Sequence, residues 1–236
     1  MKIVEKFLTL QGEGKYLGVP SYFIRSTGCN LRCAWKDNTG ITYCDTPYTS
    51  WQAEKGEILN TDEVLRFLRD KPIKHIVITG GEPMIQPDIA TVVNEFIDNK
   101  YLVTVETNGT VYRTDMSKAF MSLSPKLESS YAQDKDSNEN RIHKRNNCFY
   151  DSIEQWMKSN PYQLKFVVND AKDLIEILEL QKDWGLNHSK IYLMPQGITR
   201  EQLAEKSEWL FKTCEINGFN FSPRMHIDIW GNRRGI

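Results

Sequence analysis

Short β-like segments alternate with amphipathic helical segments along most of this chain, and that order limits the fold more than any other feature of the sequence. The clearest strand candidates are 21–25, 75–81, 102–106, 120–123, 163–168 and 191–194, and the clearest helix candidates are 61–68, 89–99, 171–184 and 201–217. Repeated strand–helix units imply a parallel sheet with helices outside it. About six core strands are expected, which is too few for a closed eight-unit barrel. The sequence therefore predicts an α/β fold built as an open, partial parallel β/α barrel.

Turn sequences follow four of the predicted strands. They are GG at 80–81, TNG at 107–109, SPK at 124–126 and PQG at 195–197. Because the carboxyl ends of parallel strands meet at one edge of a sheet, we expect these turns to converge on one rim and to carry the functional site.

Three segments fall outside the regular alternation. Residues 28–50 are rich in Gly, Asn, Asp, Thr and Pro, which predicts a loop. Residues 127–147 are polar and rich in Asn, Lys, Asp and Ser, which predicts an exposed, mobile insertion. Residues 224–230 are expected to form a last strand. The length favours one domain over residues 1–236.

The charge balance argues against a nucleic-acid partner. The chain has 30 Lys and Arg against 31 Asp and Glu, whereas a nucleic-acid binder normally has a basic excess. A small-molecule substrate is therefore favoured. No apolar run approaches the roughly 18 residues that cross a bilayer, and the N-terminus lacks the long apolar region of a signal peptide. We expect no membrane contact and a cytoplasmic location.

Three of the five cysteines, Cys29, Cys33 and Cys44, lie close together in the sequence. In a reducing compartment such clustering indicates metal binding or catalysis rather than disulfides. A [4Fe–4S] cube has four iron corners, so three thiolates would leave one iron open to a ligand. A closed zinc site usually needs four ligands, often in C-x2-C pairs, and no second pair follows here. On spacing alone, a cluster, zinc and three metal-free thiols all remain open.

The segment Thr79-Gly80-Gly81-Glu82-Pro83 ends a predicted strand. Two glycines let the backbone approach a ligand closely, and a carboxylate beside them can accept hydrogen bonds from an ammonium group. An ordinary strand-to-turn transition would have the same sequence.

In this order, the motifs resemble the radical S-adenosylmethionine superfamily and, within it, the 7-carboxy-7-deazaguanine synthase family of queuosine and deazapurine biosynthesis. The resemblance rests on TLQGEG (9–14), FIR (23–25), GCNLRC (28–33), CDT (44–46), TGGEP (79–83), ETNG (106–109), SPK (124–126) and WGNRRG (230–235). Each motif is weak alone, but the ordered set is specific and covers nearly the whole chain. It implies a partial barrel of the radical S-adenosylmethionine type.

The cysteine spacing departs from the family pattern. The family usually has C-x3-C-x2-C followed by Asp-Thr, whereas residues 34–43 separate Cys33 from Cys44 here. Asp45-Thr46 still follows Cys44, so the resemblance assigns Cys29, Cys33 and Cys44 as ligands of a [4Fe–4S] cluster. A loop extension costs little entropy. The other two cysteines are expected to be non-ligand thiols.

The resemblance implies a reaction. The family converts 6-carboxy-5,6,7,8-tetrahydropterin to 7-carboxy-7-deazaguanine, with ring contraction and loss of ammonia. The reduced cluster cleaves S-adenosylmethionine, and the resulting 5′-deoxyadenosyl radical takes a hydrogen from the substrate. The cluster and cofactor supply the chemistry, while the protein positions the parts and excludes water.

The resemblance also assigns binding residues by motif match. Those implied for the pterin substrate are Leu10, Gln11, Gly12, Arg25, Thr79 and Ile236. Those implied for S-adenosylmethionine are Tyr43, Cys44, Asp45, Gly81, Glu82, Glu106, Asn108, Ser124, Pro125, Lys126 and Gln196. Thr46 is expected to contact Mg²⁺, an ion that uses few protein ligands. No side chain is expected to generate the radical itself.

A flavodoxin-like electron donor and a homodimer are also implied by the resemblance. Two other functions remain as alternatives. A glycyl-radical activating enzyme would share the cysteines and GGE but has no reason to carry QGEG, CDT and WGNRRG. A zinc-stabilised binding module is the alternative from another class.

Overall fold

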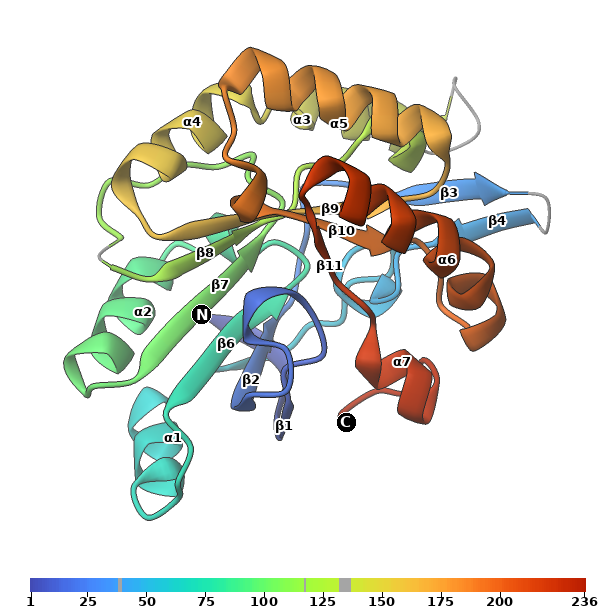
Figure 1. Cartoon of the computed structure of the whole chain (residues 1–236). Helices are drawn as coiled ribbons and strands as arrows, with labels where there is room; N and C mark the ends of the chain where they lie inside the picture. Colours follow the sequence, from blue (N-terminus) through green and yellow to red (C-terminus); the bar gives the residue numbers. More distant parts are fainter. Residues whose placement is uncertain (38–39, 117, 132–136) are drawn as a thin grey trace.

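One open sheet of mostly parallel strands forms the centre of the molecule. The computed structural model describes residues 1–37, 40–116, 118–131 and 137–236 (Figure 1). The strand order is β11-β10-β9-β8-β7-β6-β2-β1-β5, with all neighbours from β2 to β11 parallel and with β1 and β5 antiparallel at one edge. The bounds are β1 (Lys2–Leu10), β2 (Pro20–Ser26), β5 (Glu57–Ile58), β6 (His75–Gly80), β7 (Leu102–Thr107), β8 (Phe120–Leu123), β9 (Tyr162–Val168), β10 (Ile191–Pro195) and β11 (Asn220–Phe221). The expected open α/β architecture is confirmed, and the expected core strands are β2 and β6 to β10.

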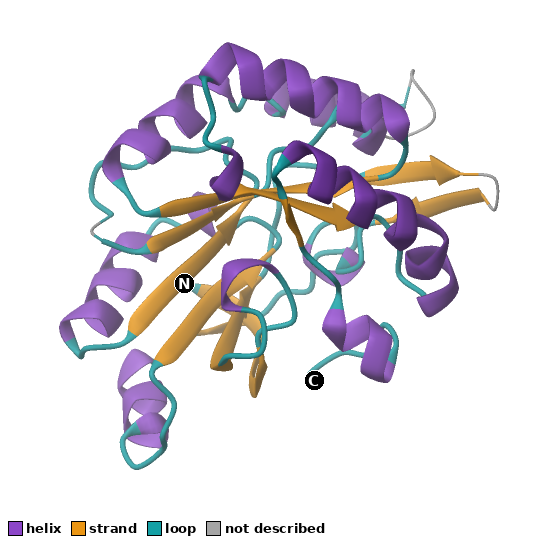
Figure 2. Cartoon of the chain, viewed as in Figure 1, coloured by secondary structure: helices purple, strands orange, loops and turns teal. Residues whose placement is uncertain are grey.

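Helices cover the outer face of this sheet (Figure 2). On this face lie α1 (Thr61–Leu68), α2 (Ile89–Asp98), α4 (Tyr150–Ser159), α5 (Ala171–Trp184) and α6 (Arg200–Asn217). In contrast, α3 (Asn138–Asn146) contacts residues 30 and 32, and α7 (Met225–Trp230) lies apart from this layer, near the C-terminus (Figure 1). Local sequence fixes the ends of α5. The Asp170 side chain accepts a hydrogen bond from the Lys172 backbone N–H at the start, and Gly185 takes a left-handed conformation, with φ of +58°, at the end.

Side chains of opposite character alternate along the central strands, because successive residues of a strand point to opposite faces. On the outer face, the apolar core contains Ile76, Ile78, Val103, Val105, Met121, Leu123, Leu164, Phe166 and Val168. On the inner face, Thr79, Glu106, Ser122 and Lys165 line a cavity. The same strands therefore stabilise the fold on one face and supply polar groups to a site on the other.

The predicted loop over residues 28–50 contains a β-hairpin, so that expectation is wrong for this part. Strand β3 (Ala34–Asp37) pairs antiparallel with β4 (Gly40–Tyr43), while residues 38–39 lie outside the described residues. The strands contain Trp, Ile, Thr and Tyr, which favour extended structure. Turn residues between two such short runs hid them from the sequence pattern.

The polar segment 127–147, predicted to be a loop, contains the helix α3. Residues 132–136 lie outside the described residues. The helix has one aliphatic side chain, so it shows no apolar periodicity. It begins at a Ser137 cap whose side chain accepts a hydrogen bond from the Asn140 backbone N–H, and it buries Asn140 and His143 instead of apolar residues.

Residues 224–230 form α7 rather than the predicted last strand. The sequence MHIDIW alternates apolar and polar residues as a strand would. The backbone N–H groups of Asp228 and Gly231 instead donate to the carbonyls of Arg224 and Ile227, which closes helical turns. A six-residue segment fits either period, so the tertiary contacts of Arg224 decide.

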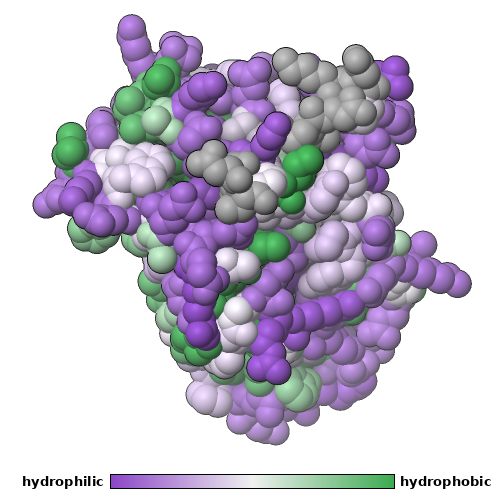
Figure 3. Space-filling model, turned by 90° about the vertical axis from the view of Figure 1, so that its right-hand side faces the viewer, coloured by the Kyte–Doolittle hydropathy of each residue, from purple (hydrophilic) through white to green (hydrophobic). Residues whose placement is uncertain are grey.

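The surface seen from the side of the β3–β4 hairpin is largely hydrophilic, with small, separate hydrophobic areas (Figure 3). Within the described residues, no helix combines the length and the apolar character that spanning a bilayer requires.

His75 joins three adjacent strands inside the sheet. Its ring nitrogens lie 2.8 Å from Ser21 Oγ of β2 and 2.7 Å from Thr104 Oγ1 of β7. The side chain is buried, and burial lowers the pKa of His75 to about 4.

We predict an acid sensitivity that this histidine causes. Below a pH of about 6.5 the unfolded chain protonates His75 while the folded chain does not, so unfolding takes up one more proton down to a pH of about 4. The free energy of unfolding should decrease as the pH falls through this window, by up to about 1.4 kcal/mol per pH unit for one proton. Above a pH of about 6.5, His75 should make no contribution to the pH dependence of stability. Urea unfolding at several pH values should show a shallower dependence for His75→Gln. The exposed His188→Gln serves as the control, and equal slopes in all three proteins would contradict the assignment.

Candidate active site

Two adjoining cavities open at the carboxyl ends of the parallel strands. Their volumes are about 160 and 360 Å³, and small-ligand sites typically occupy about 300–1,000 Å³. The residues that line both are Glu13, Asp45, Thr46, Thr79, Gly80, Glu106 and Arg224. The shared lining places the two cavities side by side, with these residues at their border.

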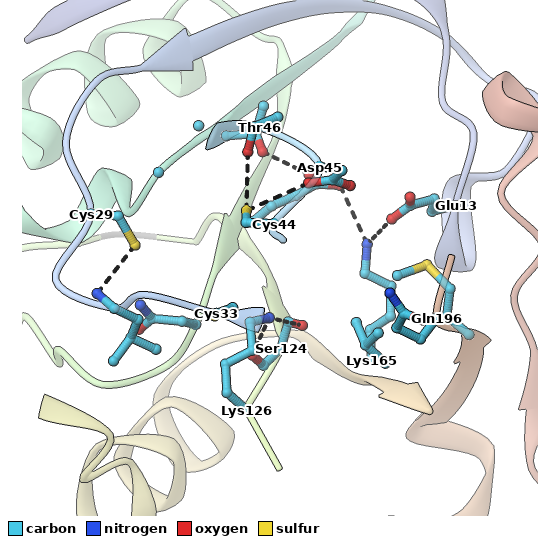
Figure 4. A pocket seen from close by; sticks show the side chains of 18 of the residues that line it. Glu13, Cys29, Cys33, Cys44, Asp45, Thr46, Ser124, Lys126, Lys165 and Gln196 are labelled. Atoms are coloured by element: carbon cyan, nitrogen blue, oxygen red, sulfur yellow. Dashed lines mark hydrogen bonds and ion pairs between the residues drawn. The ribbon is translucent and has the colours of Figure 1, made fainter. Parts of the chain in front are cut away.

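The first cavity contains the three clustered cysteines. Cys29, Cys33 and Cys44 all line it (Figure 4). Ala34 pairs with Tyr43 at the base of the β3–β4 hairpin, and the Cys44 backbone N–H donates to the Cys33 carbonyl at 3.1 Å. The hairpin therefore returns the chain to its starting point, and the ten extra residues do not separate these two cysteines in space.

The chemistry of this donor set fits an iron–sulfur cluster. All five cysteines of the chain are free of disulfides. Within the described residues, no three His, Cys, Asp or Glu side chains are close enough to bind one metal ion. The thiols instead surround a cavity beside the apolar side chains of Leu31 and Trp35. Burial raises the pKa of all three thiols, so the bound thiolate form requires the positive charge that iron provides.

The two glycines of the GGEP segment are required by close packing against the cysteine loop. A Cβ on Gly81 would lie 2.1 Å from the Gly28 carbonyl oxygen, and Gly80 has a φ of +134° and touches the Ser26 backbone. The Glu82 backbone N–H donates to the Gly28 carbonyl at 2.9 Å. The glycines thus hold the start of the cysteine loop against the end of β6.

Glu82 has a different position from the one expected of a cofactor ligand. Its side chain is buried outside both cavities. It accepts hydrogen bonds from the backbone N–H groups of Met84 and Asn108, at 2.9 and 2.7 Å, and from Thr107 Oγ1 at 2.7 Å. Burial raises its pKa. Glu82 therefore joins the GGEP turn to the TNG turn, and it orients Asn108, which does line the first cavity.

A chain of charged groups crosses the junction of the two cavities. Arg224 donates to Glu13 at 3.1 Å and to Asp45, and Lys165 donates to Glu13 and lies 3.9 Å from Glu106. Burial opposes ionisation of Glu13, but the charges of Lys165 and Arg224 lower its pKa well below the usual range. Three carboxylates therefore share two cations at the centre of the site.

The wall of the second cavity begins at this charged chain. Glu106 accepts hydrogen bonds from Gln11 Nε2 at 3.1 Å and from Thr79 Oγ1 at 2.8 Å. A Cβ on Gly12 would lie 2.6 Å from His226 Nδ1, so only glycine lets this ring approach. Burial lowers the pKa of His226, which favours a neutral ring facing the cavity.

The C-terminal residues form one wall of the second cavity. Residues 232–236 line it, and Arg234 fixes them by donating to Glu54 at 2.7 and 2.9 Å and to Glu5 at 3.2 Å. The Arg234 guanidinium also lies 4.1 Å from the centre of the Tyr48 ring. The end of the chain is therefore a wall of the site rather than a free tail.

Most of the sequence-predicted residues meet in these cavities. The second cavity is lined by Leu10, Gln11, Gly12, Arg25, Thr79 and Ile236. The first is lined by Tyr43, Cys44, Asp45, Gly81, Glu106, Asn108, Ser124, Lys126 and Gln196. Glu82 and Pro125 line neither, and Thr46 lies where the cavities meet.

Comparison with known proteins gives this arrangement a family. The model of the radical SAM superfamily matches residues 23–210. The 7-carboxy-7-deazaguanine synthase of Rhodopirellula baltica is 38% identical over 99% of this chain and 88% of its own length. That of Halobacterium salinarum is 32% identical over 98% of this chain and 91% of its own length. The chain belongs to the 7-carboxy-7-deazaguanine synthase family of radical SAM enzymes.

Structural similarity agrees with this membership. The crystal structure of QueE from Escherichia coli matches with a TM-score of 0.65 and 25% identity, over 95% of this chain and 94% of that one. Membership of the superfamily implies a [4Fe–4S] cluster and S-adenosylmethionine as cofactors. It favours the synthase over the glycyl-radical activating enzyme and the zinc-stabilised module.

Several residues of this radical SAM site were not predicted from the sequence. They are Glu13, Lys165 and Arg224 in the charged chain, and His143 against the cysteine loop. A signal existed for Lys165, since it interrupts the apolar run of the strand QLKFVV. Glu13 lies inside the QGEG motif, where only its neighbours received a role. Arg224 and His143 had no sequence signal, because the partners that connect them to the site, Glu13, Asp45 and Arg32, lie more than 100 residues away in the chain.

We predict that Cys44 is an essential cluster ligand despite its distance from Cys33 in the sequence. After anaerobic reconstitution, Cys44→Ala should lose most of its iron, because two thiolates cannot hold the cube as three do. Iron and sulfide analysis with the visible spectrum measures this. The matched control is Cys148→Ala, an exposed cysteine outside both cavities, which should keep full iron content. A Cys44→Ala protein with a complete cluster would show that the third ligand lies elsewhere.

Proposed function

We propose that this protein converts 6-carboxy-5,6,7,8-tetrahydropterin to 7-carboxy-7-deazaguanine with loss of ammonia. One observation carries the proposal: the cavity lined by the three cysteines adjoins a second cavity, lined by all six residues expected to bind the pterin, and the two share seven lining residues. A cofactor held in the first cavity would therefore lie next to a substrate held in the second. The cluster and S-adenosylmethionine, when bound, supply the one-electron chemistry that starts the reaction.

Arg25 is proposed to bind the substrate carboxylate. It lines the second cavity, and its Nε donates to Glu5. Within the described part of the chain, its two terminal nitrogens have no hydrogen-bond partner. A guanidinium held at Nε presents a planar fork that matches a carboxylate.

Gln11, Leu10 and Gly12 are proposed to bind the pterin ring. An amide side chain offers both donors and acceptors to such a ring, and Gln11 is held in place by its bond to Glu106. The C-terminal residues that line the second cavity support a small substrate over a peptide, because a glycyl-radical activating enzyme must admit a segment of a partner protein.

Thr46 is proposed to contact Mg²⁺ where the two cavities meet. Its hydroxyl lies 3.5 Å from Cys44 Sγ, and the adjacent Asp45 carboxylate is already paired with Arg224. Mg²⁺ keeps several waters and few protein ligands, so one hydroxyl beside the substrate carboxylate suits it. We further propose a single radical SAM domain, a homodimer, a flavodoxin-like electron donor and a cytoplasmic location.

The proposed activity is tested by product formation. Reconstituted protein, the tetrahydropterin, S-adenosylmethionine, Mg²⁺ and dithionite are combined without oxygen, and the products are measured by mass spectrometry. We expect 7-carboxy-7-deazaguanine. An intact cluster that cleaves S-adenosylmethionine but yields no deazaguanine would contradict the substrate assignment.

We predict that Thr46→Ala weakens the response to magnesium. The variant should keep its cluster, since Thr46 is not one of the three ligands of the cluster. It should need several-fold more Mg²⁺ for half-maximal activity. Thr46→Ser, which keeps the hydroxyl, is the matched control and should resemble the parent protein. A magnesium dependence that is identical in Thr46→Ala and the parent would assign the ion to other residues.

A further inference from the structure

The cysteine loop has a second side, which faces away from the substrate cavity and is covered by α3. The Arg32 backbone N–H donates to His143 Nδ1 at 3.3 Å, and Asn146 Nδ2 donates to the Asn30 carbonyl at 2.7 Å. Residues 30 and 32 lie between the first two cysteines. The inner face of α3 is therefore in direct contact with the loop that holds the cluster.

The outer face of α3 is basic and exposed. His143 is fully buried, whereas Arg141 and Arg145, each two residues away, are exposed. A helical rotation of about 100° per residue points both away from the buried side. Lys144 is exposed but lies over the Tyr131 ring, in a cavity that Glu128, Asp173 and Glu176 also line, so it does not add to this basic face. Glu139 in the first turn is the one acidic residue of the helix. In the described part of the chain, neither arginine takes part in an ion pair. The net charge of the whole chain is only −1, so this positive patch is local.

We propose that the outer face of α3, formed by Arg141 and Arg145, is the docking surface for an acidic one-electron carrier protein. The inference rests on the proposed function, in which the cluster must receive an electron from outside. One electron passes from the reduced carrier to the oxidised cluster, and no bond forms or breaks in this step.

The geometry favours this route over one through the substrate cavity. The cavity side of the cluster is occupied by the cofactor space, the charged chain and the C-terminal wall. On the other side, one helix of about 10 Å diameter separates the cysteine loop from solvent. Electron tunnelling falls steeply with distance, so a carrier on α3 can reduce the cluster while the substrate cavity stays closed.

Charge also favours an acidic carrier. The two exposed arginines attract a negatively charged partner, increase its association rate and make that rate sensitive to salt. Both outer positions hold charged side chains, so electrostatic attraction rather than apolar burial would form the complex.

The test separates electron delivery by a protein from the chemistry of the site. The double variant Arg141→Glu/Arg145→Glu is compared with the parent protein and with a control variant, Arg66→Glu/Arg69→Glu. The control reverses the charge of two exposed arginines in and next to α1, which lies at the far end of the molecule from α3 (Figure 1). Reduced, negatively charged flavodoxin is the probe. Cluster reduction is followed by stopped-flow absorbance without substrate, flavodoxin binding by calorimetry, and product formation with flavodoxin or with dithionite.

At low salt, we expect flavodoxin to bind the α3 variant more weakly and to reduce its cluster at least about tenfold more slowly than in the parent protein. The dithionite-supported activity and the iron content of the variant should match those of the parent. The α1 variant should match the parent in every measurement. Flavodoxin reduction that is unchanged in the α3 variant would overturn the inference.

A second measurement protects the test against misfolding of the charge-reversed protein. In the parent protein, flavodoxin reduction should slow as salt increases, and the milder Arg141→Gln/Arg145→Gln should reduce that salt dependence. A parent rate that does not respond to salt would also overturn the inference. Loss of product with dithionite in the parent protein would instead contradict the proposed function.

Discussion

Arg224 connects more of this site than any other side chain. Its three nitrogens donate to Glu13, to Asp45 and, at 2.5 Å, to the Gly197 carbonyl. These partners belong to the QGEG turn, the end of the cysteine loop and the turn after β10. A buried guanidinium needs all of its partners, since an incomplete ion pair away from water costs several kcal/mol. The three segments and the start of α7 are therefore fixed together, and with them the border between the two cavities.

Acidic and basic side chains both line that border. Glu13, Asp45 and Glu106 face Lys165 and Arg224, and Arg25 and Lys126 also line the two cavities. S-adenosylmethionine carries a sulfonium, an ammonium and a carboxylate group, so charged side chains of both signs can pair with it. Glu106 is the carboxylate best placed to meet a cationic group, because its contact with Lys165 is long, at 3.9 Å, and its other partners, Gln11 and Thr79, are neutral.

The sequence predicted what local pattern controls. Short runs rich in apolar and β-branched residues located β6 to β9, and the turns after them located the rim, because strand composition and turn sequences are properties of short segments. The β3–β4 hairpin was missed since each strand has four residues, and α3 was missed since it buries His143 and Asn140 in place of an apolar stripe. Glu82 was assigned to S-adenosylmethionine because a carboxylate beside the two glycines of the GGEP motif can accept hydrogen bonds from an ammonium group. Its side chain turns away to Thr107 and Asn108, which a motif cannot show.

The hairpin and α3 together explain how an altered cysteine loop can keep its function. The hairpin adds residues between Cys33 and Cys44 but closes on itself, so the spacing in the fold is set by one hydrogen bond between the two cysteines. Gln202 donates to Thr42 at 3.1 Å and Asn169 donates to the Lys36 carbonyl at 3.2 Å, which ties both strands to the barrel. The helix supports the opposite end of the loop through Arg32 and Asn30. The cluster loop is thus held from two directions by segments that are themselves outside the strand–helix repeat.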